Sequence, residues 1–207
     1  MVFKKIIKKM QEEKEVILGD ATKDKLYSSD NEFPTKEQAS TEFKRSIQKL
    51  FHVNQWSDMP GITSTFELHD ANGEKKPAIR PEVGDYVRIV LPGPVPENWV
   101  TVVDIKETEE TAEFTVSPSI NPTKRREDQD EIQHFFIPEA TSTFKVQLAD
   151  NRISAFEIGR NEGINNAEDA GNRKLLNTLI AEGGWAGVQE FQWNKLTDFL
   201  VHKIELE

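Results

Sequence analysis

The sequence of 207 residues contains no cysteine. That absence excludes disulfide bonds, thiolate metal sites and cysteine nucleophiles, and it fits a reducing compartment, so we predict a cytoplasmic protein. Long apolar runs are also absent: the longest are a few residues, whereas ~20 are needed to span a bilayer. The first residues lack an uninterrupted apolar stretch followed by a small-residue cleavage site. The sequence therefore predicts neither a transmembrane helix nor a signal peptide.

Positive charge is in deficit. Lysine and arginine number 26 against 36 aspartates and glutamates, which gives a formal net charge of −10. Proteins that bind nucleic acid gain affinity by neutralising phosphates and releasing their counterions, and an acidic chain works against that gain. We therefore predict no nucleic-acid partner, while the oligomeric state stays open.

Sequence signatures of catalysis and metal binding are lacking as well. The four histidines, His52, His69, His134 and His202, fall in separate predicted elements and form no HxH, HxxxH or HExxH pattern. Zinc sites need three or four convergent ligands, and no local spacing supplies even two. The phosphate-binding glycine patterns and the GxSxG elbow are also missing. We predict no metal and no cofactor, and we assign no catalytic residue.

Residues 1–34 are predicted to be an N-terminal amphipathic helix followed by a polar connector. Phe3, Ile6, Ile7 and Met10 recur at helical spacing, with lysines on both flanks of that face. Such a helix either docks on its own domain or lies on an acidic membrane surface or partner, without inserting as a span. Residues 20–34 are polar and aperiodic, which predicts a connecting loop.

Residues 35–207 are predicted to form a single α+β domain. Thr35 and Gln38 have capping-box spacing, and the apolar residues that follow predict a helix over residues 36–52. Alternation of apolar and polar residues then predicts strands near residues 62–69, 86–91, 99–105, 112–116, 134–137, 141–148 and 152–158. Pro118 and Pro122 are expected to end the fourth strand. Helical periodicity returns over residues 172–202, where Gly183 and Gly184 predict a break or a kink.

This order of elements, with Trp56 near the end of the first body helix, resembles the helix-grip fold of the START and polyketide-cyclase-like (SRPBCC) superfamily. The resemblance covers about residues 36–203. It implies a curved antiparallel sheet of six to seven strands around a long C-terminal helix, with an apolar cavity between them for hydrophobic ligands. Members usually begin with a strand before the first helix, and residues 26–33 are a poor candidate for it. The resemblance implies no site residue.

Aromatic residues occupy interior-type positions along the strands and the terminal helices, Trp193 among them. Large amphipathic rings around one sheet form either an ordinary core or the border of a partly wet ligand cavity. The residues that we predict as ligand-binding candidates are Trp56, Phe66, Tyr86, Trp99, Phe114, Phe144, Phe156 and Trp185.

Three functional hypotheses follow from these observations. The first is a non-catalytic binding or carrier protein for a small hydrophobic ligand held between the sheet and the C-terminal helix. The second is an interaction or assembly protein without a small-molecule ligand. The third is a cyclase-like or hydrolase-like enzyme that uses a cavity histidine or carboxylate as a general base.

Overall fold

The computed structural model describes residues 22–77, 79–91, 98–123, 136–162 and 185–206, with the side chains of residues 185–189 excepted. The predicted N-terminal helix and the predicted break at Gly183 and Gly184 lie outside these residues. So do residues 134 and 135 of the predicted strand at residues 134–137.

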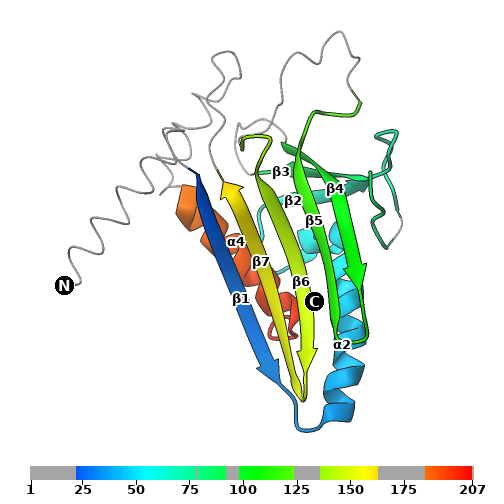
Figure 1. Ribbon diagram of the computed structural model, residues 1–207, viewed down its shortest axis with the longest axis vertical. Coiled ribbons are helices and arrows are strands. Elements are labelled where there is room, and N and C mark those ends of the chain that lie inside the picture. The colour runs from blue at the N-terminus through cyan, green and yellow to red at the C-terminus, as the bar shows by residue number, and fades with distance from the viewer. Residues whose placement is uncertain (1–21, 78, 92–97, 124–135, 163–184, 207) are drawn as a thin grey trace, which may run out of the picture.

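The described residues form a seven-stranded antiparallel sheet with helices against it (Figure 1). The elements in chain order are β1 (Lys23–Glu32), α2 (Lys36–Phe51), the 3₁₀-helix η1 (Val53–Asp58), β2 (Thr65–His69), β3 (Tyr86–Val90), β4 (Asn98–Glu107), β5 (Thr111–Ser119), β6 (Thr141–Ala149), β7 (Arg152–Glu162) and α4 (Trp185–Leu200). The strands lie in the order β1-β7-β6-β5-β4-β3-β2, and every neighbouring pair is antiparallel. The predicted α+β class is confirmed.

Helix α2 begins at Lys36, directly after the predicted cap residue Thr35. The Thr35 side-chain oxygen accepts a hydrogen bond from the backbone N–H of Gln38 at 3.1 Å, which satisfies one of the free donors at the start of α2. The helix then buries Phe43 and Leu50 against the sheet. Immediately after it, the Trp56 indole N–H donates to the carbonyl of Lys49 at 3.0 Å, which fixes η1 against the last turn of α2.

The predicted polar connector is wrong over residues 23–32, which form β1 and pair with β7 along their whole length. The inward-facing positions of β1 include Ser29 and Asn31, so apolar alternation does not reveal the strand. These polar side chains face inward because they bind the end of the C-terminal helix. Ser29 Oγ donates to Asp198 at 2.6 Å, and Asn31 Nδ2 donates to the carbonyl of Val201 at 2.9 Å.

Pro118 does not end the fourth strand of the sequence prediction, because it lies inside β5 opposite Val100 of β4. A proline cannot donate to a strand ladder, so it is tolerated where one side of the strand is unpaired. The pairing of β5 with β6 stops at Val116, two residues earlier. Pro118 therefore occupies a position with no β6 partner, and the strand continues through it.

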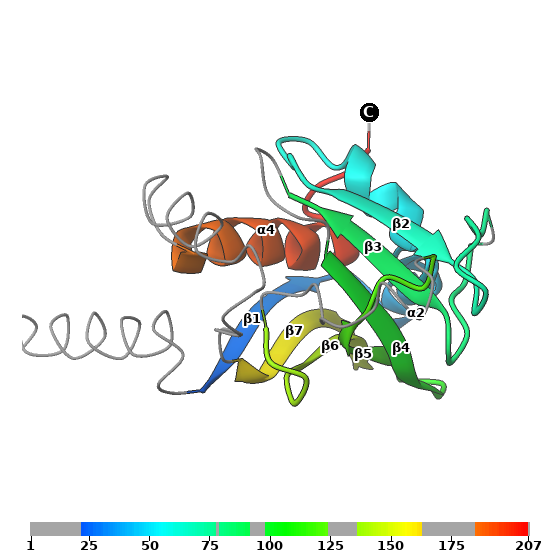
Figure 2. The same cartoon turned by 90° about the horizontal axis from the view of Figure 1, so that it is seen from above.

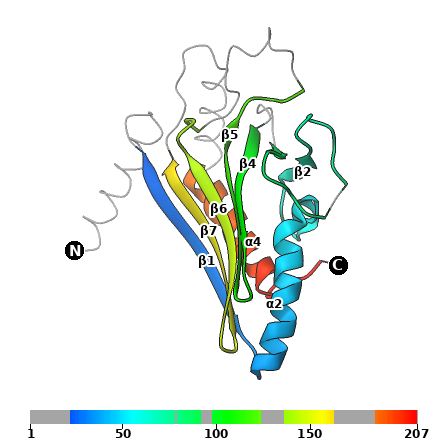
Figure 3. The ribbon, with the colours of Figure 1, turned by 45° about the vertical axis from the view of Figure 1, so that its right-hand side comes forward.

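The sheet is curved, and both long helices cover its concave face (Figures 2 and 3). α4 packs against β1 and β7, whereas α2 packs against β6 and β7 and touches α4. Between the helices and the sheet lies one main cluster of buried apolar side chains. This is the helix-grip arrangement that the resemblance implied. Among the described residues, no helix is both long and apolar enough to cross a membrane.

Candidate functional site

A pocket lies between the concave face of the sheet and α4, and its walls are mostly aromatic. Besides Phe136, the rings that line it come from five different elements: Trp56 of η1, Phe66 of β2, Phe114 of β5, Phe144 of β6 and Trp193 of α4. Their contacting pairs have centroid separations of 5.0 to 6.3 Å. Strand alternation explains the convergence, because the three phenylalanines sit at inward positions of their strands.

The volume of this pocket is about 60 Å³. A single water molecule needs roughly 10–15 Å³ on this measure, so the pocket has room for a small group. It is well below the ~300–1,000 Å³ that is usual for drug-sized ligands. A larger ligand would therefore have to displace part of the wall.

One side of the pocket is polar. It consists of Thr141 and Ser142 at the start of β6, Glu162 at the end of β7 and Gln192 of α4. The Gln192 carbonyl oxygen accepts a hydrogen bond from Ser64 Oγ at 2.7 Å, which fixes the orientation of the amide. These groups give an otherwise apolar cavity a place for one polar atom of a ligand.

Glu162 is held at the pocket by a close fit with its own strand. Its side chain folds over Gly159, where an added Cβ would come within 2.8 Å of the Glu162 carboxyl carbon. The Glu162 carboxylate also lies 3.6 Å from the ammonium of Lys25 on β1, and both side chains are buried. Only glycine at residue 159 leaves room for this arrangement.

A second carboxyl, Glu157, lies on the same concave face and has no exposed surface. In the sheet it stands between Tyr27 of β1 and Phe144 of β6. Neither carboxyl oxygen has a hydrogen-bond partner among the described residues. Burial, followed by the charge of Glu162, raises the pKa of Glu157 to about 8, while Ser142 and Lys25 act in the opposite direction. Glu157 is therefore an uncharged acid at pH 7.

The structure brings four of the eight predicted ligand-binding residues together at the pocket: Trp56, Phe66, Phe114 and Phe144. Trp185 has a side chain outside the described residues. The other three, Tyr86, Trp99 and Phe156, lie elsewhere on the sheet.

Tyr86, Trp99 and Phe156 occupy the convex side of their strands. Tyr86 pairs with His69 in the sheet, and the Trp99 ring lies 4.8 Å from the His69 ring. Phe156 alternates with the inward-facing Glu157 and borders a separate hollow of about 410 Å³ that also contains Leu26. These three aromatic residues do not face the pocket.

Neither the polar residues of the site nor Trp193 were among the ligand-binding residues predicted from the sequence. A signal for Glu157 does exist, because Ile153 and Ala155 are buried apolar residues at the preceding alternate positions of β7. Extending that period by two residues points Glu157 inward and Phe156 outward. Phe156 was predicted from its aromatic side chain, whereas the period of β7 places it on the outward face.

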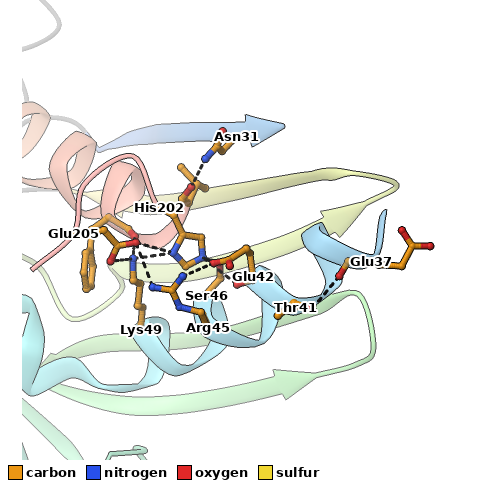
Figure 4. Close-up of polar contacts among 11 residues, drawn as sticks. Asn31, Glu37, Thr41, Glu42, Arg45, Ser46, Lys49, His202 and Glu205 are labelled. Carbon is orange, nitrogen blue, oxygen red and sulfur yellow. Dashed lines mark hydrogen bonds and ion pairs between the residues drawn. The ribbon is translucent and has the colours of Figure 1, made fainter. Parts of the chain in front are cut away.

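The histidines with buried rings lie away from the pocket. His69 is buried on the convex side, with Nδ1 3.0 Å from the carbonyl of Gly73. His202 belongs to a polar cluster that joins the C-terminal segment to α2 (Figure 4). Its Nε2–H donates to the carbonyl of Glu42 at 3.0 Å, while Nδ1 accepts from the Lys49 ammonium at 2.9 Å. Burial and the Lys49 charge lower the pKa of His202.

In the part of the chain that the structure describes, no three histidine, aspartate or glutamate side chains are grouped so that they could hold a metal ion.

Comparison with known proteins shows a likeness of fold. A crystal structure of a hypothetical protein from Helicobacter pylori aligns with a TM-score of 0.56 at 12% identity, covering 93% of this chain and 94% of that chain. Norcoclaurine synthase from Thalictrum flavum aligns with a TM-score of 0.43 at 10% identity, over 88% of this chain and 98% of that chain. The major latex-like protein 151 of Panax ginseng gives 0.37 at 12% identity, over 77% and 93% of the two chains.

No family model matches this chain, and no curated protein matches it either. The alignment with the Helicobacter pylori protein shows a shared fold, and no function follows from it.

Proposed function

We propose that this protein binds a small, largely apolar ligand in the pocket between the concave face of the sheet and α4. The observation that carries the proposal is the convergence of aromatic rings from five elements around a cavity with one polar side. Burial of an apolar ligand against such rings is favourable by roughly 25 cal/mol per Å² of apolar surface removed from water. The polar side would orient the ligand.

Binding is better supported than catalysis. General acid or base catalysis needs a group within hydrogen-bond reach of the substrate. Glu157 has no exposed surface and does not border the cavity, and Glu162 already lies beside the Lys25 ammonium. His69 Nε2 lies 3.9 Å from the Glu67 carboxylate. His69 is on the convex face of the sheet, however, and the pocket is on the concave face.

The hollow beside Phe156 is larger, but it supports a ligand less well. Its charged groups already satisfy one another, since Arg160 donates to the Asp24 carboxylate at 2.6 Å. A ligand there would have to replace that exposed ion pair while remaining open to solvent.

A pocket-filling substitution tests the proposal. Ala140 is buried in the pocket wall just before β6, so Ala140→Leu places extra methyl groups in the cavity. We expect toluene and cyclopentanone to produce saturable shifts of pocket resonances in ¹H–¹⁵N NMR spectra of the wild type. The variant should bind both at least roughly tenfold more weakly, because the added volume of the side chain competes with the ligand.

The matched control is Ala149→Leu, at the exposed end of the same strand. This variant should bind like the wild type. The proposal fails if no probe gives a saturable shift, or if Ala140→Leu and Ala149→Leu bind the probes equally well.

A further inference from the structure

We propose that the ligand of this pocket carries an uncharged hydrogen-bond-accepting oxygen, such as a ketone, aldehyde or ester carbonyl, which the side chains of Gln192 and Trp193 bind. This inference rests on the proposed function and names the chemical class of the ligand. It follows from two residues of the pocket wall, Gln192 and Trp193, whose side chains offer N–H donors.

Gln192 presents its amide N–H groups because its oxygen is already engaged. The side chain is only 6% exposed, and Oε1 accepts from Ser64 Oγ at 2.7 Å. With that oxygen occupied, the amide nitrogen is the group left for another partner, and it donates to no side chain in the described residues.

Trp193, the following residue of α4, supplies a second donor to the pocket wall. It is 9% exposed, its ring lines the pocket, and its buried Nε1–H has no acceptor among the described residues. The indole of Trp56 in the same wall is different, because its N–H already donates to the carbonyl of Lys49 at 3.0 Å. An indole nitrogen can only donate, so its missing partner must be an acceptor.

Charge around the pocket favours an uncharged acceptor over a carboxylate or an ammonium. The Glu162 carboxylate lines the cavity, so an anionic ligand would meet a like charge in a buried site. An ammonium would bring further donors to a wall that already presents donors, and Glu162 has the Lys25 ammonium at 3.6 Å. A carbonyl oxygen accepts two hydrogen bonds and carries no charge.

Three ligands with the same five-membered ring test the inference on the wild-type protein: cyclopentanone, methylenecyclopentane of the same shape, and cyclopentylammonium. The readout is the indole N–H resonance of each tryptophan in ¹H–¹⁵N NMR. We expect cyclopentanone to move the Trp193 resonance downfield and to bind roughly tenfold more tightly than methylenecyclopentane, which lacks the acceptor.

Trp99 is an internal control. Its buried Nε1–H also lacks a described partner, but it lies on the opposite face of the sheet and lines no part of the pocket. Its resonance should stay in place as cyclopentanone is added. Trp193→Phe and Trp99→Phe assign the two peaks.

Two substitutions separate the donors from the apolar wall. Trp193→Phe keeps a ring and removes the N–H, and Gln192→Met keeps the chain length and removes the amide. Each should weaken cyclopentanone binding roughly tenfold more than it weakens methylenecyclopentane binding. Trp99→Phe should change neither.

The outcomes distinguish this inference from the function on which it rests. If none of the three ligands binds, the proposed function itself fails. If cyclopentanone and methylenecyclopentane bind equally well, the pocket is a binding site without the acceptor specificity. Tighter binding of cyclopentylammonium than of cyclopentanone would overturn the inference in favour of a cationic ligand.

Discussion

Replacing Glu157 by glutamine keeps the shape of the side chain and removes its ability to ionise. In the folded protein Glu157 is fully buried, and its pKa is raised to about 8. In the unfolded chain the same carboxyl ionises around its ordinary value of 4.5. At pH 7 unfolding therefore releases a proton from this residue, which favours the unfolded state.

The size of the effect follows from the two pKa values. Each pKa unit corresponds to about 1.36 kcal/mol, so the 2.5 units between 4.5 and pH 7 are worth about 3 kcal/mol. Because the folded pKa is raised, the contribution of Glu157 to the stability of the wild type is fully present below pH 4.5 and is lost as the pH rises to about 8. Glu157→Gln should be more stable by up to about 3 kcal/mol at pH 7 and should lack this part of the pH dependence.

Urea unfolding followed by far-ultraviolet circular dichroism from pH 5 to pH 9 measures the difference. The two stability curves should lie close together near pH 5 and separate as the pH rises. Glu139→Gln, at an exposed carboxyl before β6, is the control and should follow the wild type. Parallel curves for Glu157→Gln and the wild type across the whole range would refute a protonated Glu157 in the folded state.

Three further predictions concern the groups around this core. His202 has a lowered pKa, so its contribution to stability is present above about pH 6.5 and is lost as the pH falls; an NMR titration midpoint at or above 6.5 would contradict this. Ser29→Ala removes a hydrogen bond to α4 and should cost about 1 kcal/mol in urea unfolding, whereas the exposed Ser28→Ala should cost nothing measurable. Gly159→Ala should displace the Glu162 side chain and destabilise the protein by roughly 1–3 kcal/mol; an unchanged melting temperature would show that the strand adapts.

The helices and strands that could be predicted from the sequence are those with one buried face and one face exposed to solvent. Helix α2 has both a cap at Thr35 and an apolar stripe, and β6 buries Phe144 and Val146 between more exposed neighbours. In such elements the period of the hydrophobic pattern reports the geometry directly. Their existence and type could therefore be predicted, with boundaries shifted by a few residues.

The rest could not be predicted because tertiary contacts reverse the usual pattern. The inward positions of β1 are polar, since Ser29 and Asn31 bind the end of α4. In β4 three successive residues beginning at Asn98 are buried, because both faces of the sheet are covered there. Aromatic type alone then cannot tell which face Trp99 occupies.

The candidate site was predictable in its apolar half alone. Aromatic rings mark the cavity, and four of them were identified from the sequence, three at inward strand positions and Trp56 in η1. The buried acid at Glu157 arises from desolvation and from the nearby charge of Glu162, which is five residues away in the sequence but reaches back over Gly159. No local sequence pattern predicts that the Glu162 side chain lies over Gly159.

Strand β1 lies at one edge of the described sheet. Its outward-facing residues influence whether the edges of two molecules can pair. If two copies paired their β1 strands antiparallel about Tyr27, Asp24 of one copy would stand opposite Asp30 of the other. Pairing about Ser28 would place Asp24 opposite Glu32. Like charges directly across a strand pair are destabilising, and exposed edges that carry them resist edge-to-edge association. The acidic residues along this strand therefore disfavour these two registers, although Arg152 and Arg160 of β7 partly offset their charge.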